Sequence, residues 1–380
     1  MTGTKDRNKR NTKAIIIPAA IIGTVLVIAV VCVCILIHYI HKMNYVPLRE
    51  NYTLLAETGT FEEDVTNPEE ETSSDSSQEE IDEYKRLTEE ALSKVDGEYK
   101  PIGDVYNILL IGSDTRQADG EGRSDTMMLI SVNKTEKKII ATSFLRDLYV
   151  KIPEKGYYKI NASYAYGGVE LLLDTLKSNF SIEIDRYIAV DFYSFVKVVD
   201  ILGGLDVDVQ ENELYWLNQY IHASNLLLDE DEHDGYLEHA DGSYQHLNGK
   251  QALAYSRFRY VGNGDFTRTE RQRKVVNLIF DKLKSVTPSQ LIELLDVLLP
   301  EITTNVPTGE FLELIALLPQ MSQYEIVSWG IPDDKFKYIT IKGDSYIGID
   351  FNYYIDKIYN TISVSYTHLR AHETDQYLVC

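Results

Sequence analysis

The basic residues of this chain gather in one short segment. The 380 residues hold 37 Lys and Arg against 59 Asp and Glu, a formal net charge of -22. The basic side chains of residues 252–274 are Arg257, Arg259, Arg268, Arg271, Arg273 and Lys274. Only Asp265 and Glu270 oppose them. Because a planar guanidinium donates two hydrogen bonds at once, arginine suits phosphate. The segment therefore predicts an anion site, with a salt-bridged helix face as the alternative.

The spacing of these arginines indicates how they are presented. Arg257 and Arg259 are two residues apart and share a face if the chain is extended there. Arg268 and Arg271 are three residues apart and are neighbours on a helix. Asp265 is placed to cap that helix, so that Arg268 falls in the first turn, where the helix dipole also attracts anions.

Two carboxylates flank the ends of predicted strands. Asp114 follows the apolar run 105–111 and Gly112, and Asp125 leads into the next apolar run. Mg²⁺ is commonly bound by one or two carboxylates together with phosphate oxygens of the substrate, which predicts a metal site. The alternative is a loop in which these side chains make Asx-turn hydrogen bonds.

Alternating strands and helices must position these groups. Strands are predicted at 105–111, 126–132, 138–144, 186–190, 205–209 and 324–329. Apolar residues at three- and four-residue spacing predict helices at 169–179, 193–202, 267–284, 288–299 and 308–318. This alternation favours an α/β fold, a single large α-β-α domain over residues 101–363 with a central mixed sheet.

The N-terminal segment has the pattern of a membrane anchor. Residues 1–13 carry a net charge of +4, and no charged side chain occurs from Ala14 to Ile37. Roughly 20 apolar residues span a bilayer core, whereas the apolar part of a signal peptide has only about 7–15. We therefore predict an uncleaved transmembrane helix at 14–38. The basic flank places residues 1–13 in the cytoplasm and the rest outside.

An acidic tether is predicted between this helix and the domain, over residues 39–100. Residues 57–83 hold twelve acidic side chains and no Lys or Arg. Such a segment repels itself and cannot bury a core. A short amphipathic helix is expected within the tether, at 81–95.

Other segments limit the possible functions. The acidic stretch 211–245 includes His233 and His239; we interpret it as a solvated insertion, with a metal site as the alternative. Residues 364–380 resemble translated sequencing-adapter read-through and are expected to be non-native. Three cysteines exclude a disulfide framework, and the acidic balance argues against a nucleic-acid binder.

Six ordered motifs lie between residues 105 and 362. They are GSDTR at 112–116, RSDT at 123–126, FLRDL at 144–148, KIN with SY at 159–164, LNGKQALAYSRFR at 247–259 and GDFTRTERQR at 264–273. Together they resemble the LytR-CpsA-Psr (LCP) family of membrane-anchored cell-wall ligases.

The resemblance implies a phosphotransferase. Family members take an anionic glycopolymer, such as wall teichoic acid or capsular polysaccharide, from an undecaprenyl-pyrophosphate carrier and attach it to peptidoglycan through a phosphodiester. By this resemblance Asp114 and Asp125 hold Mg²⁺. The side chains expected on the pyrophosphate are Arg123, Arg146, Arg257, Arg259, Arg268, Arg271 and Gln272. The expected catalytic residues are Asp125, Arg146 and Arg257.

Several roles stay open at this level. The family's polyprenyl chain lies in an apolar channel between sheet and helices, and the apolar faces of 169–176 and 192–202 either line it or are ordinary core. The base that activates the acceptor hydroxyl is Asp125 or Asp147. Asp114 could also organise the site through Arg116 instead of binding the metal.

Two other functions compete with the ligase. One is a polyprenyl-pyrophosphate phosphatase with water as acceptor, and the other is a non-catalytic envelope regulator or transcriptional attenuator. A cytoplasmic segment of 13 residues is too short for a DNA-binding domain. The expected location is the cell membrane of a Gram-positive-type envelope, with one span, a cytoplasmic N-terminus and an extracellular domain.

Overall fold

The structure is a computed structural model that describes most of the chain beyond the N-terminal region. The described residues are 42, 44–48, 75–95, 105–113, 124–228 and 230–363. The predicted basic tail, the membrane helix 14–38, most of the tether and the tail 364–380 lie outside them. Within the described part, no helix combines the length and the apolar character needed to span a membrane.

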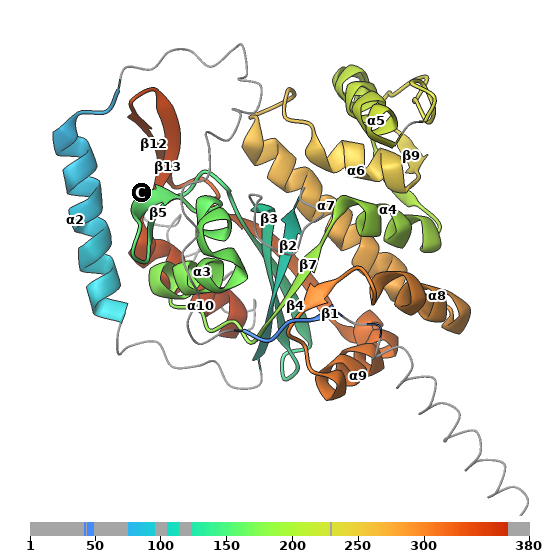
Figure 1. Ribbon diagram of the computed structural model, residues 1–380, viewed down its shortest axis with the longest axis horizontal. Helices are drawn as coiled ribbons and strands as arrows, with labels where there is room; N and C mark the ends of the chain where they lie inside the picture. Colours follow the sequence, from blue (N-terminus) through green and yellow to red (C-terminus); the bar gives the residue numbers. More distant parts are fainter. Residues whose placement is uncertain are drawn as a thin grey trace, which may run out of the picture.

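A seven-stranded sheet forms the middle layer of the molecule (Figure 1). In spatial order its strands are β1 (Asn44–Tyr45), β10 (Thr303–Thr304), β7 (Arg186–Val190), β2 (Val105–Ser113), β3 (Ser124–Asn133), β4 (Lys138–Phe144) and β11 (Glu325–Ile331). The pairs β2–β7 and β4–β11 are parallel, whereas β2–β3 and β3–β4 are antiparallel. The prediction of a central mixed sheet is confirmed.

Strands β3 and β4 are covered on both faces. Nearly all of their residues are buried, which is typical of strands with near-continuous apolar sequences. Successive side chains point to opposite faces. Met127 and Leu129 therefore belong to one core, and Met128 and Ile130 to another.

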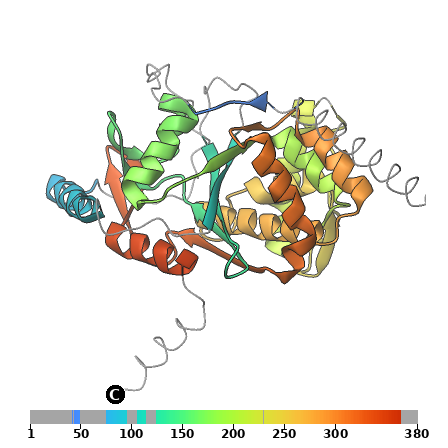
Figure 2. The ribbon, with the colours of Figure 1, turned by 90° about the horizontal axis from the view of Figure 1, so that it is seen from below.

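One outer layer is built from helices and two hairpins that are distant in sequence. It contains α3 (Ala162–Phe180), α10 (Phe351–Ser363), the hairpin β5 (Tyr149–Ile152)–β6 (Gly156–Lys159) and the hairpin β12 (Phe336–Ile341)–β13 (Asp344–Ile349). The fully buried Leu172 and nearly fully buried Phe180 and Phe351 join this layer to the sheet. The view from below shows it on the side opposite the remaining helices (Figure 2).

The other outer layer contains most of the helices. They are α4 (Phe192–Ile201), α5 (Leu214–Leu228), α6 (Gly249–Arg257), α7 (Asp265–Leu283), α8 (Pro288–Leu298) and α9 (Thr308–Leu317), with short 3₁₀ turns at Glu211–Glu213 and Leu318–Gln323. A separate ribbon, β8 (Leu205–Asp208) with β9 (Tyr244–Leu247), lies among them. The three layers give the predicted α-β-α arrangement.

Two local expectations need correction. The strand expected at 205–209 does not join the central sheet, because β8 pairs with β9 instead. Asp265 is the first residue of α7 and not its cap, since Gly264 occupies the cap position with a φ of 52°, which glycine tolerates best.

A third difference concerns the arginines at 257 and 259. Asn248 and Gln251 form a capping box that starts α6, and this helix continues to Arg257. The two arginines therefore do not share one face of an extended segment. Arg257 ends a helix, and Arg259 follows it in an irregular segment.

The helix expected in the tether packs against the domain. It is α2 (Gln78–Val95), three residues longer at its start than predicted, with Ile81, Tyr84 and Ala91 buried. The Tyr84 hydroxyl donates a hydrogen bond to the backbone carbonyl of Tyr149, 2.8 Å away. This amphipathic helix thus completes the outer layer of hairpins (Figure 1).

The acidic stretch 211–245 is fastened to α6. Lys250, only 9% exposed, donates to Glu230 and Asp234 at 2.6 Å and to Asn225 at 2.7 Å. Leu217 and Ile221 of α5 are fully buried. Among the described residues, no group of three or more His, Cys, Asp or Glu side chains is arranged to hold a metal. The stretch is therefore not solvated throughout as interpreted, because α5 packs into a core, while Lys250 neutralises part of the acidic segment after it.

Candidate functional site

The candidate site forms where the start of β3 meets the end of β4. The two strands are antiparallel, and Met127 pairs with Phe144. This register brings Asp125, the second residue of β3, beside Arg146, two residues beyond β4. Arg146 donates a hydrogen bond to Oδ1 of Asp125 over 3.0 Å. The pair therefore joins two residues that are 21 positions apart.

The first turn of α7 adds a second carboxylate to the same point. Oδ1 of Asp265 lies 2.8 Å from Nη2 of Arg268, 3.6 Å from Nε of Arg146 and 3.7 Å from Nε of Arg259. Nη1 of Arg268 is in turn 4.0 Å from Asp125. Three arginines from separate segments thus converge on two carboxylates, and we call these five residues the arginine cluster.

Arg268 is the most deeply buried member of the arginine cluster. Its side chain is only 3% exposed, and its Nε has no hydrogen-bond partner among the described residues. Burial lowers the pKa of Arg268, and Arg146 and Arg259 lower it further, while Asp265 opposes the change. A guanidinium still remains charged at neutral pH. The buried contacts to Asp265 and Asp125 fix the position of this cation.

Asp147 lies next to the cluster but is already engaged. Its carboxylate is 2.8 Å from Nζ of Lys159 and 3.6 Å from Nε of Arg146. Burial would raise the pKa of Asp147, but the charges of Lys159 and Arg146 outweigh it and hold the pKa below its ordinary value. Asp147 therefore stays ionised and orients the two cations.

The other predicted arginines lie in different surroundings. The guanidinium of Arg257 packs 4.3 Å from the ring centre of Phe192 at the start of α4. Arg271 is 3% exposed, donates to the backbone carbonyl of Phe258, and lies 2.9 Å from Glu213. This buried pair fastens α7 to the 3₁₀ turn before α5. Gln272 is half-buried on α7.

Part of the predicted set lies outside the described residues. Asp114, Arg116 and Arg123 belong to the segment 114–123, which the structure does not describe. The described strands end directly beside it, since Ser113 pairs with Ser124. Of the two predicted metal ligands, Asp114 and Asp125, the structure describes only Asp125.

The two segments proposed for a lipid channel differ in packing. In 169–176, Leu171, Leu172 and Leu176 are fully buried in the core beside the sheet, so that they match the ordinary-core alternative. Along α4, by contrast, Phe195, Val196 and Val198 are only half-buried. The helix α4 is thus the better candidate for a surface that covers a lipid.

The roles of two site residues, Asp265 and Glu213, are not predicted from the sequence. The sequence predicts Asp265 as a helix cap and as an acid opposing the arginines, but not as the carboxylate on which Arg146, Arg259 and Arg268 meet. Glu213 is 58 residues from Arg271 and carries no signal in the sequence. Only the tertiary structure brings the 3₁₀ turn Glu211–Glu213 beside α7.

The fold and the site together define an α-β-α domain with three arginines and two carboxylates gathered beside the ends of β3 and β4. The chain belongs to the LytR_cpsA_psr family, whose sequence pattern matches residues 68–360. The resemblance stated from the six motifs is thereby confirmed.

Relatives in this family carry two kinds of name. A polyisoprenyl-teichoic acid–peptidoglycan teichoic acid transferase TagU of Enterococcus faecalis is 35% identical over 188 residues, 48% of this chain and 55% of that protein. The regulatory protein MsrR of Staphylococcus aureus is 32% identical over 214 residues, 56% of this chain and 59% of that protein. The matched region spans little more than half the length of these relatives.

A solved structure shares the fold. It is the Bacillus subtilis family protein YwtF (TagT) with bound octaprenyl pyrophosphate lipid. It is 26% identical, has a TM-score of 0.51, and the match covers 70% of this chain and 94% of that one.

Proposed function

We propose that this protein is a membrane-anchored phosphotransferase that moves an anionic glycopolymer from an undecaprenyl-pyrophosphate carrier onto peptidoglycan. The observation that carries the proposal is the arginine cluster, in which Arg146, Arg259 and Arg268 converge beside the ends of β3 and β4. The names of the TagU relative and of the lipid-bound TagT structure support the same reaction class.

For phosphoryl transfer the protein mainly has to position the reacting groups and supply positive charge. Phosphoryl transfer spreads negative charge over the phosphate oxygens, and preformed cations stabilise it. Arg146, Arg259 and Arg268 would contact the pyrophosphate. Asp125 and Asp265 would hold these three arginines in place. An acceptor hydroxyl oxygen bonds to the phosphorus that carries the polymer, and the bridging P–O bond breaks. The lipid phosphate leaves with the electron pair, and the hydroxyl proton passes to water.

The proposal includes Mg²⁺ at Asp125. Arg146 hydrogen-bonds to Oδ1 of this carboxylate, which is 27% exposed, so that Oδ2 is available as a hard oxygen ligand. Asp114 and phosphate oxygens would complete the site. Because the guanidinium groups of Arg146 and Arg268 already lie within 4.0 Å of Asp125, a metal cation there needs the negative charge of the pyrophosphate as well. The ion would neutralise charge on that group.

The ion pairs of Asp147 argue against this residue as the base that activates the acceptor hydroxyl. Asp147 is held by Lys159 and Arg146, and its lowered pKa makes it a weak proton acceptor. We therefore assign it a positioning role. Asp125 remains a proposed catalytic residue through the Mg²⁺ that it would hold. Arg257, which packs on Phe192 at the start of α4, remains one through contact with the pyrophosphate.

The test is transfer by the full chain in detergent, with a lipid-pyrophosphate-linked polymer, peptidoglycan fragments and Mg²⁺. Arg268→Ala should lower the rate at least 100-fold, because the charge offset at the phosphate is lost. Arg86→Ala is the matched control, since Arg86 pairs with Glu83 and Glu90 on the exposed face of α2. Release of free sugar phosphate without a conjugate would identify a phosphatase instead. Full activity in Arg268→Ala would refute the site.

A further inference from the structure

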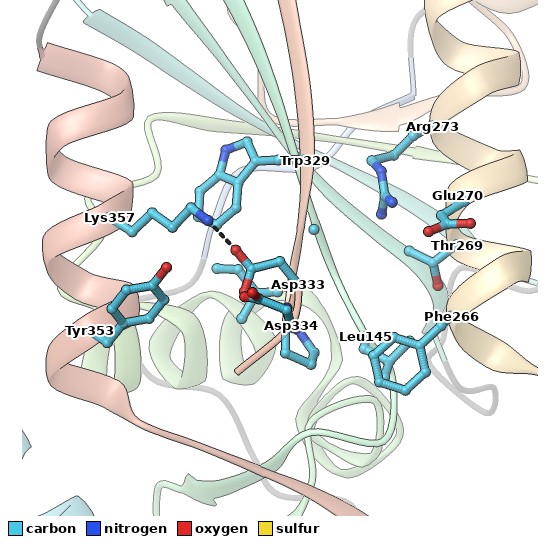
Figure 3. Close-up of a pocket in the computed structure, with 13 residues that line it drawn as sticks. Leu145, Phe266, Thr269, Glu270, Arg273, Trp329, Asp333, Asp334, Tyr353 and Lys357 are labelled. Carbon is cyan, nitrogen blue, oxygen red and sulfur yellow. Dashed lines mark hydrogen bonds and ion pairs between the residues drawn. The ribbon is translucent and has the colours of Figure 1, made fainter. Parts of the chain in front are cut away.

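A cavity of about 480 Å³ lies over the edge strand β11, between α7 and α10 (Figure 3). Its volume falls within the range of small-molecule sites, roughly 300–1,000 Å³. Leu145 and Phe266 form part of its wall. They are the immediate chain neighbours of Arg146 and Asp265, so the cavity lies next to the arginine cluster along two segments of the chain.

Aromatic rings and charged groups line this cavity together. Trp329 of β11 and Tyr353 of α10 lie on either side of Lys357, whose Nζ is 5.1 Å and 5.7 Å from their ring centres (Figure 3). From the opposite wall, Glu270 and Arg273 of α7 approach. A sugar has apolar C–H faces that pack on rings and hydroxyl groups that hydrogen-bond to charged side chains. This combination fits a saccharide.

The polar groups of the cavity are held in place. Asp333 accepts hydrogen bonds from Lys357 and, at 2.6 Å, from the Tyr354 hydroxyl. Arg273 donates to Oγ of Ser143 at 2.6 Å. It can do so because Gly330 has no side chain, since a Cβ there would lie 2.5 Å from Nη1 of Arg273. Such preformed positions reduce the ordering that a ligand must impose.

The charge of the lining residues favours a neutral or amine-bearing glycan over a polyanionic polymer. Three carboxylates, Glu270, Asp333 and Asp334, face two cations, Arg273 and Lys357. Glu270 and Asp334 are exposed to the solvent. A polyanionic polymer would be repelled by the excess of carboxylates, whereas a neutral or amine-bearing glycan would not.

We propose that the cavity over β11 binds the saccharide of the acceptor and presents its hydroxyl group to the pyrophosphate at the arginine cluster. This inference rests on the proposed function, because it names the subsite for one of the two substrates. The alternative occupant of the cavity is a sugar of the anionic donor polymer, and the test distinguishes it from the acceptor saccharide.

The test uses Trp329 as a reporter in the full chain. The chain has two tryptophans, so Trp216→Phe leaves Trp329 as the single tryptophan signal. The probes are a soluble peptidoglycan disaccharide-tetrapeptide and, in a second arm, a glycerol phosphate oligomer. We expect a saturable fluorescence change with the first probe only. Tyr353→Ala and Glu270→Gln should weaken that binding at least 10-fold, and Tyr338→Ala, an exposed tyrosine outside the cavity, should not.

The outcomes distinguish this inference from the proposed function. No fluorescence change with the disaccharide-tetrapeptide, or saturation by the glycerol phosphate oligomer alone, would overturn the acceptor site. In the transfer assay, Tyr353→Ala should raise KM for the acceptor at least 10-fold and leave KM for the donor unchanged. Unchanged acceptor KM refutes the inference while transfer stands. Saturable glycan binding without any transfer would support the site and refute the phosphotransferase.

Discussion

At the scale of single residues, the arginine cluster depends on the carboxylates between its arginines. Arg146 lies within 3.6 Å of Asp125, Asp147 and Asp265. Without these anions, three guanidinium groups would repel one another in a largely buried place, at a high desolvation cost. The carboxylates therefore hold the three cations together.

Asp147 gives a prediction about pH. Its pKa is lowered in the folded state, so its contribution to the free energy of unfolding is present at neutral pH and is lost as the pH falls through the folded pKa. We expect the stability gap between wild type and Asp147→Asn to be largest near pH 7. It should narrow as the pH falls below the ordinary Asp value of about 3.9. Chemical denaturation at several pH values measures the gap.

Asp174→Asn is the control for that series. Asp174 is exposed on α3, and this variant removes one carboxylate without breaking the contact to Lys159. A gap for Asp147→Asn that widens toward acid would contradict the assignment of Asp147 as a paired, ionised group.

At the scale of elements, α7 carries the site and must be held in register with its neighbours. Arg271 and Glu213 form a buried pair, 3% and 8% exposed, between α7 and the turn before α5. Removing one partner of a buried pair costs roughly 3–5 kcal/mol. Glu213→Ala should therefore lower the free energy of unfolding by that amount and reduce transfer, because α7 also carries Arg268.

Glu211→Ala is the matched control, since Glu211 is exposed in the same 3₁₀ turn. Urea denaturation of the two variants gives the comparison. Equal stability of Glu213→Ala and Glu211→Ala would show that the Arg271 pair does not fasten α7.

The contact between α4 and α6 depends on a single glycine. A Cβ at Gly249 would lie 2.1 Å from the backbone oxygen of Val196. Gly249→Ala must push the two helices apart and should destabilise the domain by about 1–3 kcal/mol. At Gly309 of α9, nothing lies within 4 Å of an added Cβ. Gly309→Ala should instead be neutral or stabilise by up to about 1 kcal/mol, through helix propensity. Thermal unfolding compares the two, and similar melting temperatures would contradict the close approach.

At the scale of the whole molecule, the proposal places the domain outside the cell. The predicted membrane helix and its basic flank lie outside the described residues, so topology needs its own measurement. In a background with Cys32, Cys34 and Cys380 replaced by Ser, we expect Ser74→Cys to react with a membrane-impermeant maleimide on intact protoplasts. Thr12→Cys should react only after lysis. The reverse pattern would place the domain in the cytoplasm.

Much of the fold was predictable because the strong signals are local. The strands β4 and β7 have the bounds predicted from sequence, and β3, α7 and α8 are within a few residues of theirs. Their apolar periodicity follows from which face each element buries. The hairpins β5–β6 and β12–β13 and the short helix α6 were not predicted, since short polar or mixed segments carry little periodicity.

The sequence by itself determined the residue types and the order of the motifs that make this protein an LCP family member. It also located the basic segment in an acidic chain, because charge and spacing are properties of the chain alone. Only the tertiary structure decided which of those arginines meet. Arg146, Arg259 and Arg268 converge because β3 and β4 are antiparallel and α7 starts beside their ends, whereas Arg271 turns to Glu213. The cavity over β11 likewise exists only through packing. Its lining residues run from Leu145 to Lys357, and no local sequence pattern predicts that such distant segments meet.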